Sequence, residues 1–190
     1  MQAEAGASAR WDASMDELVS RASEGSRDAF AEIYRHLFEP VAKYIYYRIG
    51  ERTEAEAMAN EVFLTTWESM PNYRGGYFPG WVFRIARNQS VGYVRKLSKM
   101  RTVELGAVED RAALGPTVEE QAETRIHHQK LFIAMKKLKE EQREIVIMKF
   151  ILGMTNPEVA QYLNKTENAV NAQQHRALKS LKRHMEAEGL

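Results

Sequence analysis

Helical periodicity is the feature of this 190-residue sequence that most limits its fold. Between residues 30 and 49, apolar side chains recur at steps of three and four, the spacing that gathers them on one face of a helix. They are Phe30, Ile33, Tyr34, Leu37, Val41, Tyr44, Ile45 and Ile49. Few stretches alternate apolar and polar residues, as a half-buried strand does. The sequence therefore predicts an all-α protein.

Start and stop signals divide the chain into two helical blocks. In the first block, we expect a long helix from Ser26 to Gly50 and a further one opened by a capping box of Thr53 and Glu56. The glycine-rich loop "NYRGGYFPG" then precedes a helix from Trp81 to about Lys99. In the second block, short joints separate four expected helices at residues 126–138, 140–152, 155–163 and 166–186.

The segment between the blocks has a different composition. Residues 102–124 read "TVELGAVEDRAALGPTVEEQAET", which is acidic and has no aromatic residue. Such a segment buries too little apolar surface to order itself, so we expect a linker. The predicted organisation is a disordered tail at 1–14, a helical domain at 15–100, a flexible acidic linker at 101–125 and a second small helical domain at 126–186.

The net charge is only +1, but acidic and basic residues are concentrated in separate segments of the chain. Residues 1–72 carry 7 basic and 13 acidic side chains, whereas residues 73–101 carry 7 basic and none acidic. Residues 126–185 carry 11 basic and 5 acidic side chains. Two separate basic blocks predict two places that meet a polyanion.

Other compositional features exclude whole classes of site. The chain has no cysteine, which rules out disulfides, a thiol nucleophile and cysteine-ligated zinc. The first 14 residues contain no apolar run, and no later stretch approaches the roughly 20 apolar residues that span a bilayer. We therefore expect no signal peptide, no membrane insertion and a cytoplasmic protein.

Residues 155–186 have the spacing of a helix-turn-helix. Thr155 and Glu158 form a capping box, and Thr166 is the expected N-cap of the next helix. Asn164 lies at the joint, where a left-handed backbone is usual and asparagine tolerates it. The short joint predicts two helices that cross closely.

The last helix has an apolar face and a face suited to DNA. Opposite the apolar stripe lie Asn168, Asn171, Ala172, His175, Arg176 and Lys179. In the major groove, amides read adenine, cations read guanine and a small residue fits beside a thymine methyl group. Lys165 and Thr166, at the helix N-terminus, are placed for phosphates. A solvated bundle helix is the alternative, but it normally favours Glu and Lys over Asn, Gln and His.

A second candidate contact lies in "NYRGGYFPGWVFRIARNQSVGYVRK", where aromatic residues interleave with cations and no acid occurs. Aromatic faces stack on unpaired bases while cations follow the backbone, which is the chemistry of single-stranded nucleic acid. Some of these rings must instead belong to the core.

Two motif blocks carry a family resemblance. "NEVFLTTWESMPNYRG" followed by "WVFRIARN" resembles region 2 of bacterial RNA polymerase sigma factors, in the extracytoplasmic-function (ECF) group of the sigma-70 family. "LKEEQREIVIMKFILGMTNPEVAQYLNKTENAVNAQQHRALKSLK" resembles region 4 of the same family. The resemblance covers about residues 15–186. It implies a region 2 domain that binds core polymerase and melts the minus-10 element, and a region 4 domain that reads the minus-35 element.

The resemblance also implies roles for single residues. Asn60, Glu61 and Phe63 lie in the helix that the family docks on the largest polymerase subunit. The candidate minus-10 residues are Tyr73, Arg74, Trp81, Arg84, Arg87 and Asn88, of which Tyr73 and the loop after it correspond to the segment that captures a flipped base. The candidate minus-35 residues are Lys165, Thr166, Asn171, Ala172, His175, Arg176 and Lys179.

Partners follow from the same resemblance. We expect core RNA polymerase, promoter DNA and an anti-sigma factor, with no cofactor, no bound metal and no catalysis by this chain. The sequence departs from the family in three places. Asn60 stands where Gln is usual, Pro79-Gly80 replaces a polar pair, and "VNAQQHRAL" has fewer cations than is common.

Three other interpretations fit the sequence less well. A conventional helix-turn-helix regulator would bind duplex DNA without polymerase, but it leaves the acid-free aromatic loop unexplained. A recombinase needs a nucleophile or clustered carboxylates, and the basic blocks contain neither. A metal site at His127-His128 is disfavoured because adjacent helical residues point about 100° apart.

Overall fold

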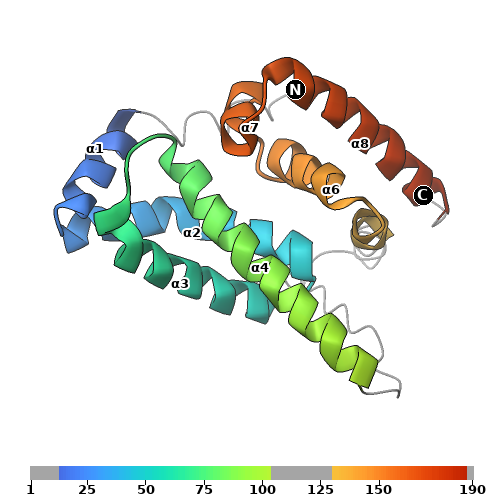
Figure 1. Ribbon diagram of the computed structural model, residues 1–190, viewed down its shortest axis with the longest axis horizontal. Coiled ribbons are helices and arrows are strands. Elements are labelled where there is room, and N and C mark those ends of the chain that lie inside the picture. The colour runs from blue at the N-terminus through green and yellow to red at the C-terminus, as the bar shows by residue number, and fades with distance from the viewer. Residues whose placement is uncertain (1–12, 104–129, 188–190) are drawn as a thin grey trace, which may run out of the picture.

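The computed structural model describes residues 13–103 and 130–187, and it is helical with no strand among those residues (Figure 1). The all-α fold class predicted from the sequence is confirmed. Of the predicted tail at 1–14, residues 1–12 lie outside the described residues, as do residues 104–125 of the predicted linker and His127-His128. Residues 13 and 14 instead begin helix α1 (Ala13–Ser23). Within the described part of the chain, no helix is both long and apolar enough to cross a membrane.

The first block is a cluster of helices around α2. It comprises α1 (Ala13–Ser23), α2 (Arg27–Ile49), α3 (Arg52–Ser69), a 3₁₀ turn at Met70–Asn72 and α4 (Phe78–Val103). Helix α2 packs against α1, α3 and α4. Its predicted apolar stripe supplies the core, since Ile33, Leu37, Val41, Tyr44 and Ile45 are all fully buried.

The ends of α2 are those expected from the sequence. The Ser26 hydroxyl accepts a hydrogen bond from the Ala29 N–H at 3.3 Å and caps the N-terminus. Gly50 ends the helix with a left-handed φ of 85°. A Cβ added at Gly50 would lie 2.2 Å from Cζ of Phe132, so this glycine also allows the Phe132 ring to approach.

The predicted N-cap of α3 was wrong. Glu51, not Thr53, is the cap, and its carboxylate accepts from the N–H groups of Thr53 at 2.9 Å and Glu54 at 2.6 Å. Thr53 lies inside the first turn instead. A carboxylate satisfies two free N–H groups and also meets the positive end of the helix dipole, which explains why it replaces the hydroxyl cap.

Helix α4 is longer at both ends than predicted. It begins at Phe78, because Pro79 is tolerated in a first turn where N–H groups have no partner anyway. It continues to Val103, so residues 101–103 are helical rather than part of the predicted linker.

The second block comprises a helix at residues 130–136, α6 (Glu140–Val146), α7 (Asn156–Leu163) and α8 (Glu167–Ala187). The sequence predicted one regular helix over 140–152, but residues Ile147–Ile151 form a π-helical turn. There the Leu152 N–H donates to the Ile147 carbonyl five residues back, at 2.9 Å. Such turns insert one residue into a helix and often lie near functional sites.

The helix-turn-helix is confirmed. The capping box of Thr155 and Glu158 is present, and Asn164 adopts the left-handed conformation with φ 52° and ψ 50°. Helix α7 packs against α8, and Ala160, Val170 and Ala177 are buried. The turn at Asn164 therefore fixes the orientation of α8 relative to α7.

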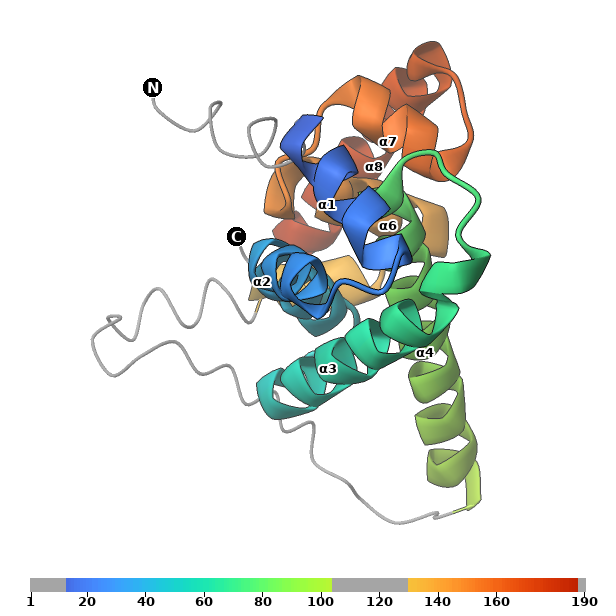
Figure 2. The ribbon, with the colours of Figure 1, turned by 90° about the vertical axis from the view of Figure 1, so that its left-hand side faces the viewer.

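The two blocks pack against each other. Helix α7 contacts α4, and the π turn contacts α2. Figure 2, turned by 90°, shows α6 and α7 beside the first block in this second view as well. This contact brings residues from both blocks together around Glu144.

The cap assignment at α3 can be tested by two alanine substitutions. Glu51→Ala should lower the free energy of unfolding by about 1 kcal/mol, because two N–H groups lose their acceptor. Thr53→Ala is the matched control and should change it by less than about 0.5 kcal/mol. Urea unfolding followed by circular dichroism measures both. A larger loss in Thr53→Ala would restore the capping box predicted from the sequence.

Candidate nucleic-acid interface

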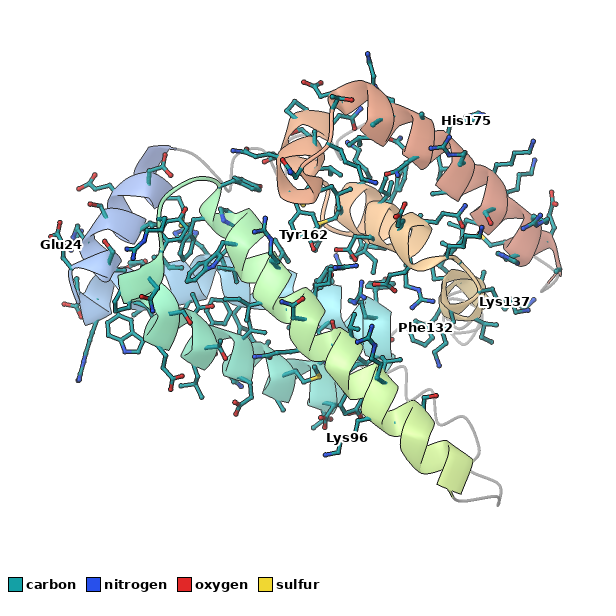
Figure 3. The ribbon with its side chains drawn as sticks, in the orientation of Figure 1. Glu24, Lys96, Phe132, Lys137, Tyr162 and His175 are labelled. Atoms are coloured by element: carbon teal, nitrogen blue, oxygen red, sulfur yellow. The ribbon has the colours of Figure 1, made fainter. Side chains whose placement is uncertain are left out.

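Helix α8 presents the predicted minus-35 residues to solvent. Its buried stripe contains Val170, Ala177 and Leu181. All the predicted residues lie on the exposed side or at the preceding joint: Lys165, Thr166, Asn171, Ala172, His175, Arg176 and Lys179. Figure 3 shows His175 on the outer side of α8. The structure thus gathers these residues on one accessible surface.

Some of these residues have partners that orient them. The Asn171 carboxamide oxygen accepts a hydrogen bond from the Asn156 side chain, at the start of α7. The Thr166 hydroxyl accepts from the Ala169 N–H at 3.2 Å and so acts as the helix cap. Lys165 Nζ lies 3.8 Å from the Glu141 carboxylate. The sequence interpretation missed Asn156, because its position as the first residue of α7 gives no sign that it reaches α8.

The predicted minus-10 loop forms a ring-lined cavity. Tyr73 packs on Phe78 and Trp81, with ring centroids 5.3 and 5.0 Å away. The Tyr73 hydroxyl donates to the Gly76 carbonyl at 2.7 Å and closes the loop on itself. A cavity of about 470 Å³ lies beside these rings, and it is lined by Asn72, Tyr73, Arg74, Gly75, Gly76, Tyr77, Gly80, Trp81, Arg84, Gln161 and Tyr162.

Tyr77 belongs to this cavity although the sequence marked it only as one ring among several. Its hydroxyl oxygen is buried and has no hydrogen-bond partner. Burial, and then the nearby charge of Glu158, raise the pKa of Tyr77, so the phenol stays protonated. A buried donor without a partner is costly unless a ligand supplies an acceptor.

The remaining predicted minus-10 residues divide into two groups. Arg74, Arg84 and Asn88 are exposed. Arg87 is half-buried, and its Nε lies 3.9 Å from carboxylate oxygens of both Glu140 and Glu144 in the second block. Arg87 therefore lies at the boundary with the second block, with 41% of its side chain still exposed.

The predicted polymerase-binding residues lie on different faces of α3. Asn60 and Glu61 are exposed, and the Asn60 side chain accepts from the Tyr34 hydroxyl at 2.9 Å. Phe63 is only 3% exposed and packs on Phe30, Tyr34 and Phe38, so it supports this surface from within. Leu64, which the sequence interpretation missed, is 56% exposed and lies three and four residues after Glu61 and Asn60, on the same face.

A buried polar cluster joins the two blocks. Glu144 of α6 accepts hydrogen bonds from Arg48 and from the Tyr44 hydroxyl at 2.8 Å on one side, and from Tyr162 of α7 on the other. Arg48 also pairs with Glu140. Figure 3 places Tyr162 at the boundary between α7 and α4.

The protonation states of this cluster follow from its surroundings. Burial, and then the Glu144 charge, raise the pKa of both Tyr44 and Tyr162, so both phenols remain donors. Burial opposes the charge on Arg48, but the nearby carboxylates of Glu144 and Glu140 favour it, and the pKa of Arg48 is raised overall. Burial alone would raise the pKa of Glu140, yet the hydrogen bond from Arg48 lowers it overall.

No group of three or more His, Asp or Glu residues that could hold a metal occurs among residues 13–103 and 130–187. The rings, amides and cations of the surfaces above offer stacking, hydrogen bonding and ion pairing.

Two segments of the chain match known protein families. Residues 33–100 match the family described as sigma-70 region 2, and residues 129–181 match sigma-70, region 4. The chain is 31% identical over 173 residues to the ECF RNA polymerase sigma factor BldN of Streptomyces coelicolor, covering 90% of this chain and 66% of the relative. It is 30% identical over 186 residues to SigD of Mycobacterium tuberculosis, covering 92% and 85%.

Solved structures share the fold. The structure of CnrH in complex with the cytosolic domain of CnrY has a TM-score of 0.65 and 20% identity, and it covers 90% of this chain and 96% of that chain. The sigma factor RpoE from Bartonella quintana, in complex with the anti-sigma factor NepR, also has a TM-score of 0.65, with 17% identity over 83% of this chain and 96% of that one. With both sigma-70 regions present in order and relatives matched along most of its length, the chain belongs to the ECF sigma factors of RNA polymerase.

Proposed function

We propose that this protein binds core RNA polymerase in the cytoplasm and directs it to promoters, with the first domain melting the minus-10 element and the second reading the minus-35 element. The observation that carries the proposal is the presence of two DNA-suited surfaces of different chemistry. One is a ring-lined cavity beside Tyr73 and Trp81, and the other is the amide and cation face of α8. Catalysis belongs to the polymerase, and an anti-sigma factor is a further proposed partner.

The division of labour has a physical basis. A flipped base costs a few kcal/mol of unstacking, which a cavity lined by rings and by the unpartnered Tyr77 hydroxyl can offset. The exposed face of α8 suits an intact major groove, which admits a helix. Each surface alone is small, but binding both to one polymerase makes the second contact effectively intramolecular.

Run-off transcription from a genomic fragment library tests this function directly. Core polymerase with the protein should produce new start sites that share a two-part upstream element. Core polymerase alone should not. If transcription is unchanged while the protein alone shifts duplex DNA, the conventional regulator replaces this proposal.

Base reading by α8 makes a sequence-dependent prediction. Asn171→Ala and His175→Ala should each weaken binding of holoenzyme to the cognate minus-35 element by about 1–3 kcal/mol, because each removes a base-edge contact. Lys182→Ala, an exposed cation farther along α8, is the control and should have a smaller effect. Competition binding with cognate and substituted elements measures this. Equal losses on every sequence would assign Asn171 and His175 to the phosphates.

Melting by the first domain makes a separate prediction. Trp81→Ala should slow open-complex formation roughly 5- to 100-fold, the loss expected when one base loses its stacking partner. A promoter with a mismatched, already open minus-10 element should restore the rate. Permanganate footprinting of unpaired thymines follows both reactions. If the open template fails to restore the rate, Trp81 acts through folding or polymerase binding instead.

The exposed side of α3 yields a prediction for polymerase binding. Leu64→Glu should weaken binding to core polymerase about tenfold or more, because it places a charge in the apolar centre of the proposed contact. Leu97→Glu in α4, at a residue that is 41% exposed against 56% for Leu64, is the matched control. Fluorescence anisotropy of the labelled protein titrated with core polymerase measures both. A similar loss in the two variants would remove α3 from the interface.

A further inference from the structure

A hydrogen bond between two asparagines links the two helices of the helix-turn-helix. Asn156, the first residue of α7, donates from its side-chain amide to the side-chain oxygen of Asn171 on α8, 15 residues further along the chain. Asn171 is exposed and is a candidate minus-35 residue, whereas Asn156 is half-buried. The bond therefore joins a residue proposed to face DNA to a partner on the helix that packs against α8 (Figure 1).

The surroundings of Asn156 decide which end of its amide faces α8. Its side-chain oxygen is buried and has no hydrogen-bond partner. Turning the amide by half a rotation would put the NH₂ group in that buried place, with two N–H donors lacking acceptors. Buried N–H groups without acceptors are rarer in proteins than carbonyl oxygens without their full set of donors. Asn156 is thus held with its oxygen inward and its NH₂ group toward Asn171.

This orientation fixes the amide of Asn171 in turn. A donor on Asn156 requires an acceptor, so Asn171 directs its oxygen toward α7. The NH₂ group of Asn171 is then the end of the amide left for the groove. That end offers two N–H donors and no acceptor. Toward DNA, Asn171 therefore acts as a donor.

Base edges in the major groove differ in what they offer to a donor. Guanine presents two acceptors, N7 and O6, whereas cytosine presents only the amino group at N4, which is itself a donor. Adenine places one acceptor, N7, beside a donor, and its usual pairing with asparagine uses both ends of the amide. An Asn171 whose oxygen is engaged by Asn156 is therefore best suited to guanine and least suited to cytosine.

We propose that Asn156 is a positioning residue that sets the hydrogen-bond polarity of Asn171, so that α8 selects guanine at the base that Asn171 contacts. The inference rests on the proposed function, in which α8 reads the minus-35 element. It replaces the adenine that the side-chain code alone would assign to an asparagine. Asn156 acts through Asn171 and does so without touching DNA itself.

Selection from a DNA library tests the assigned base. Promoter fragments carry random base pairs across the minus-35 element and a mismatched, already open minus-10 element, so that binding does not depend on melting. Holoenzyme assembled from core polymerase and the full chain binds the library, and sequencing of the bound DNA gives the base ratios at each position. Asn171→Ala identifies the contacted position, because the base preference disappears there. In the parent, we expect a G·C pair at this position, favoured over the opposite orientation by roughly 5- to 100-fold.

Asn156→Asp should reverse the polarity. A carboxylate only accepts hydrogen bonds, so Asn171 must turn its NH₂ group toward α7 and its oxygen outward. Cytosine or adenine, whose amino groups donate, should then replace guanine in the selected DNA, and the ratio of guanine to cytosine should fall about tenfold or more. The N-terminal end of a helix favours a negative charge, so α7 is retained.

Two further variants separate polarity from charge and from folding. Asn156→Ala leaves the Asn171 amide free to turn either way, so the ratio of guanine to cytosine should come within about threefold of equality. Pro157→Asp is the matched control, since Pro157 is the exposed next residue and the change adds the same charge beside an unaltered Asn156. It should weaken binding to all sequences alike and keep guanine. Helical circular dichroism checks the fold of each variant.

The outcomes distinguish this inference from the proposed function. An A·T pair at the Asn171 position in the parent would overturn the inference alone, as would the same selected base in the parent and in Asn156→Asp. The inference also fails if Asn171→Ala changes the base ratios at no position of a selected element. A holoenzyme that selects no minus-35 element at all would contradict the proposed function, and the inference with it.

Discussion

The carboxylate of Glu144 is the point on which the arrangement of the two domains depends. It brings a charge into a buried boundary, and three donors from α2 and α7 compensate it. The positions of Arg48 at the end of α2 and of Tyr162 on α7 follow from this requirement. Even Arg87 of α4, farther away at 3.9 Å, is turned toward the same charge.

The two domains also differ in how they prepare a surface for DNA. The first builds a concave site, in which a tyrosine hydroxyl closes its own loop and rings form the wall. The second builds a convex site, where a capped turn with a left-handed Asn164 fixes the angle of α8. A cavity suits a base removed from its stack, whereas a projecting helix suits the groove of an intact duplex. The chain thus has a site suited to an unstacked base in the first domain and a helix suited to duplex DNA in the second.

Local features of this fold could be predicted from the sequence, and long-range ones could not. The stripe along α2, the glycine stop at Gly50 and the left-handed Asn164 each follow from spacing or backbone preference. The π turn after Val146 has no such signal, because residues 145–152 are apolar except for Lys149, so a shift of one residue leaves no visible break in a stripe. Glu51 was missed as a cap because the Thr53–Glu56 spacing imitates a capping box two residues later.

In the candidate site too, some features could be predicted from the sequence and others could not. Periodicity placed the candidate residues of α8 on its exposed side, as the structure has them, although Leu178, expected on the apolar face, is 38% exposed. It could not tell that Phe63 would be 3% exposed and Leu64 56% exposed, because both are apolar and adjacent. Nor does any local pattern show that Arg48 pairs with Glu144, or that Arg87 comes within 3.9 Å of the carboxylates of Glu140 and Glu144.

Gly50 contributes both to local structure, at the end of α2, and to the contact between the two domains. Its left-handed backbone ends α2, and its missing side chain makes room for the ring of Phe132 from the other domain. Asparagine tolerates that backbone but would still place a Cβ 2.2 Å from the ring. Evolutionary change at position 50 is therefore tied to change at position 132. Among related chains, a residue larger than glycine at the first position should be accompanied by a smaller, non-aromatic one at the second.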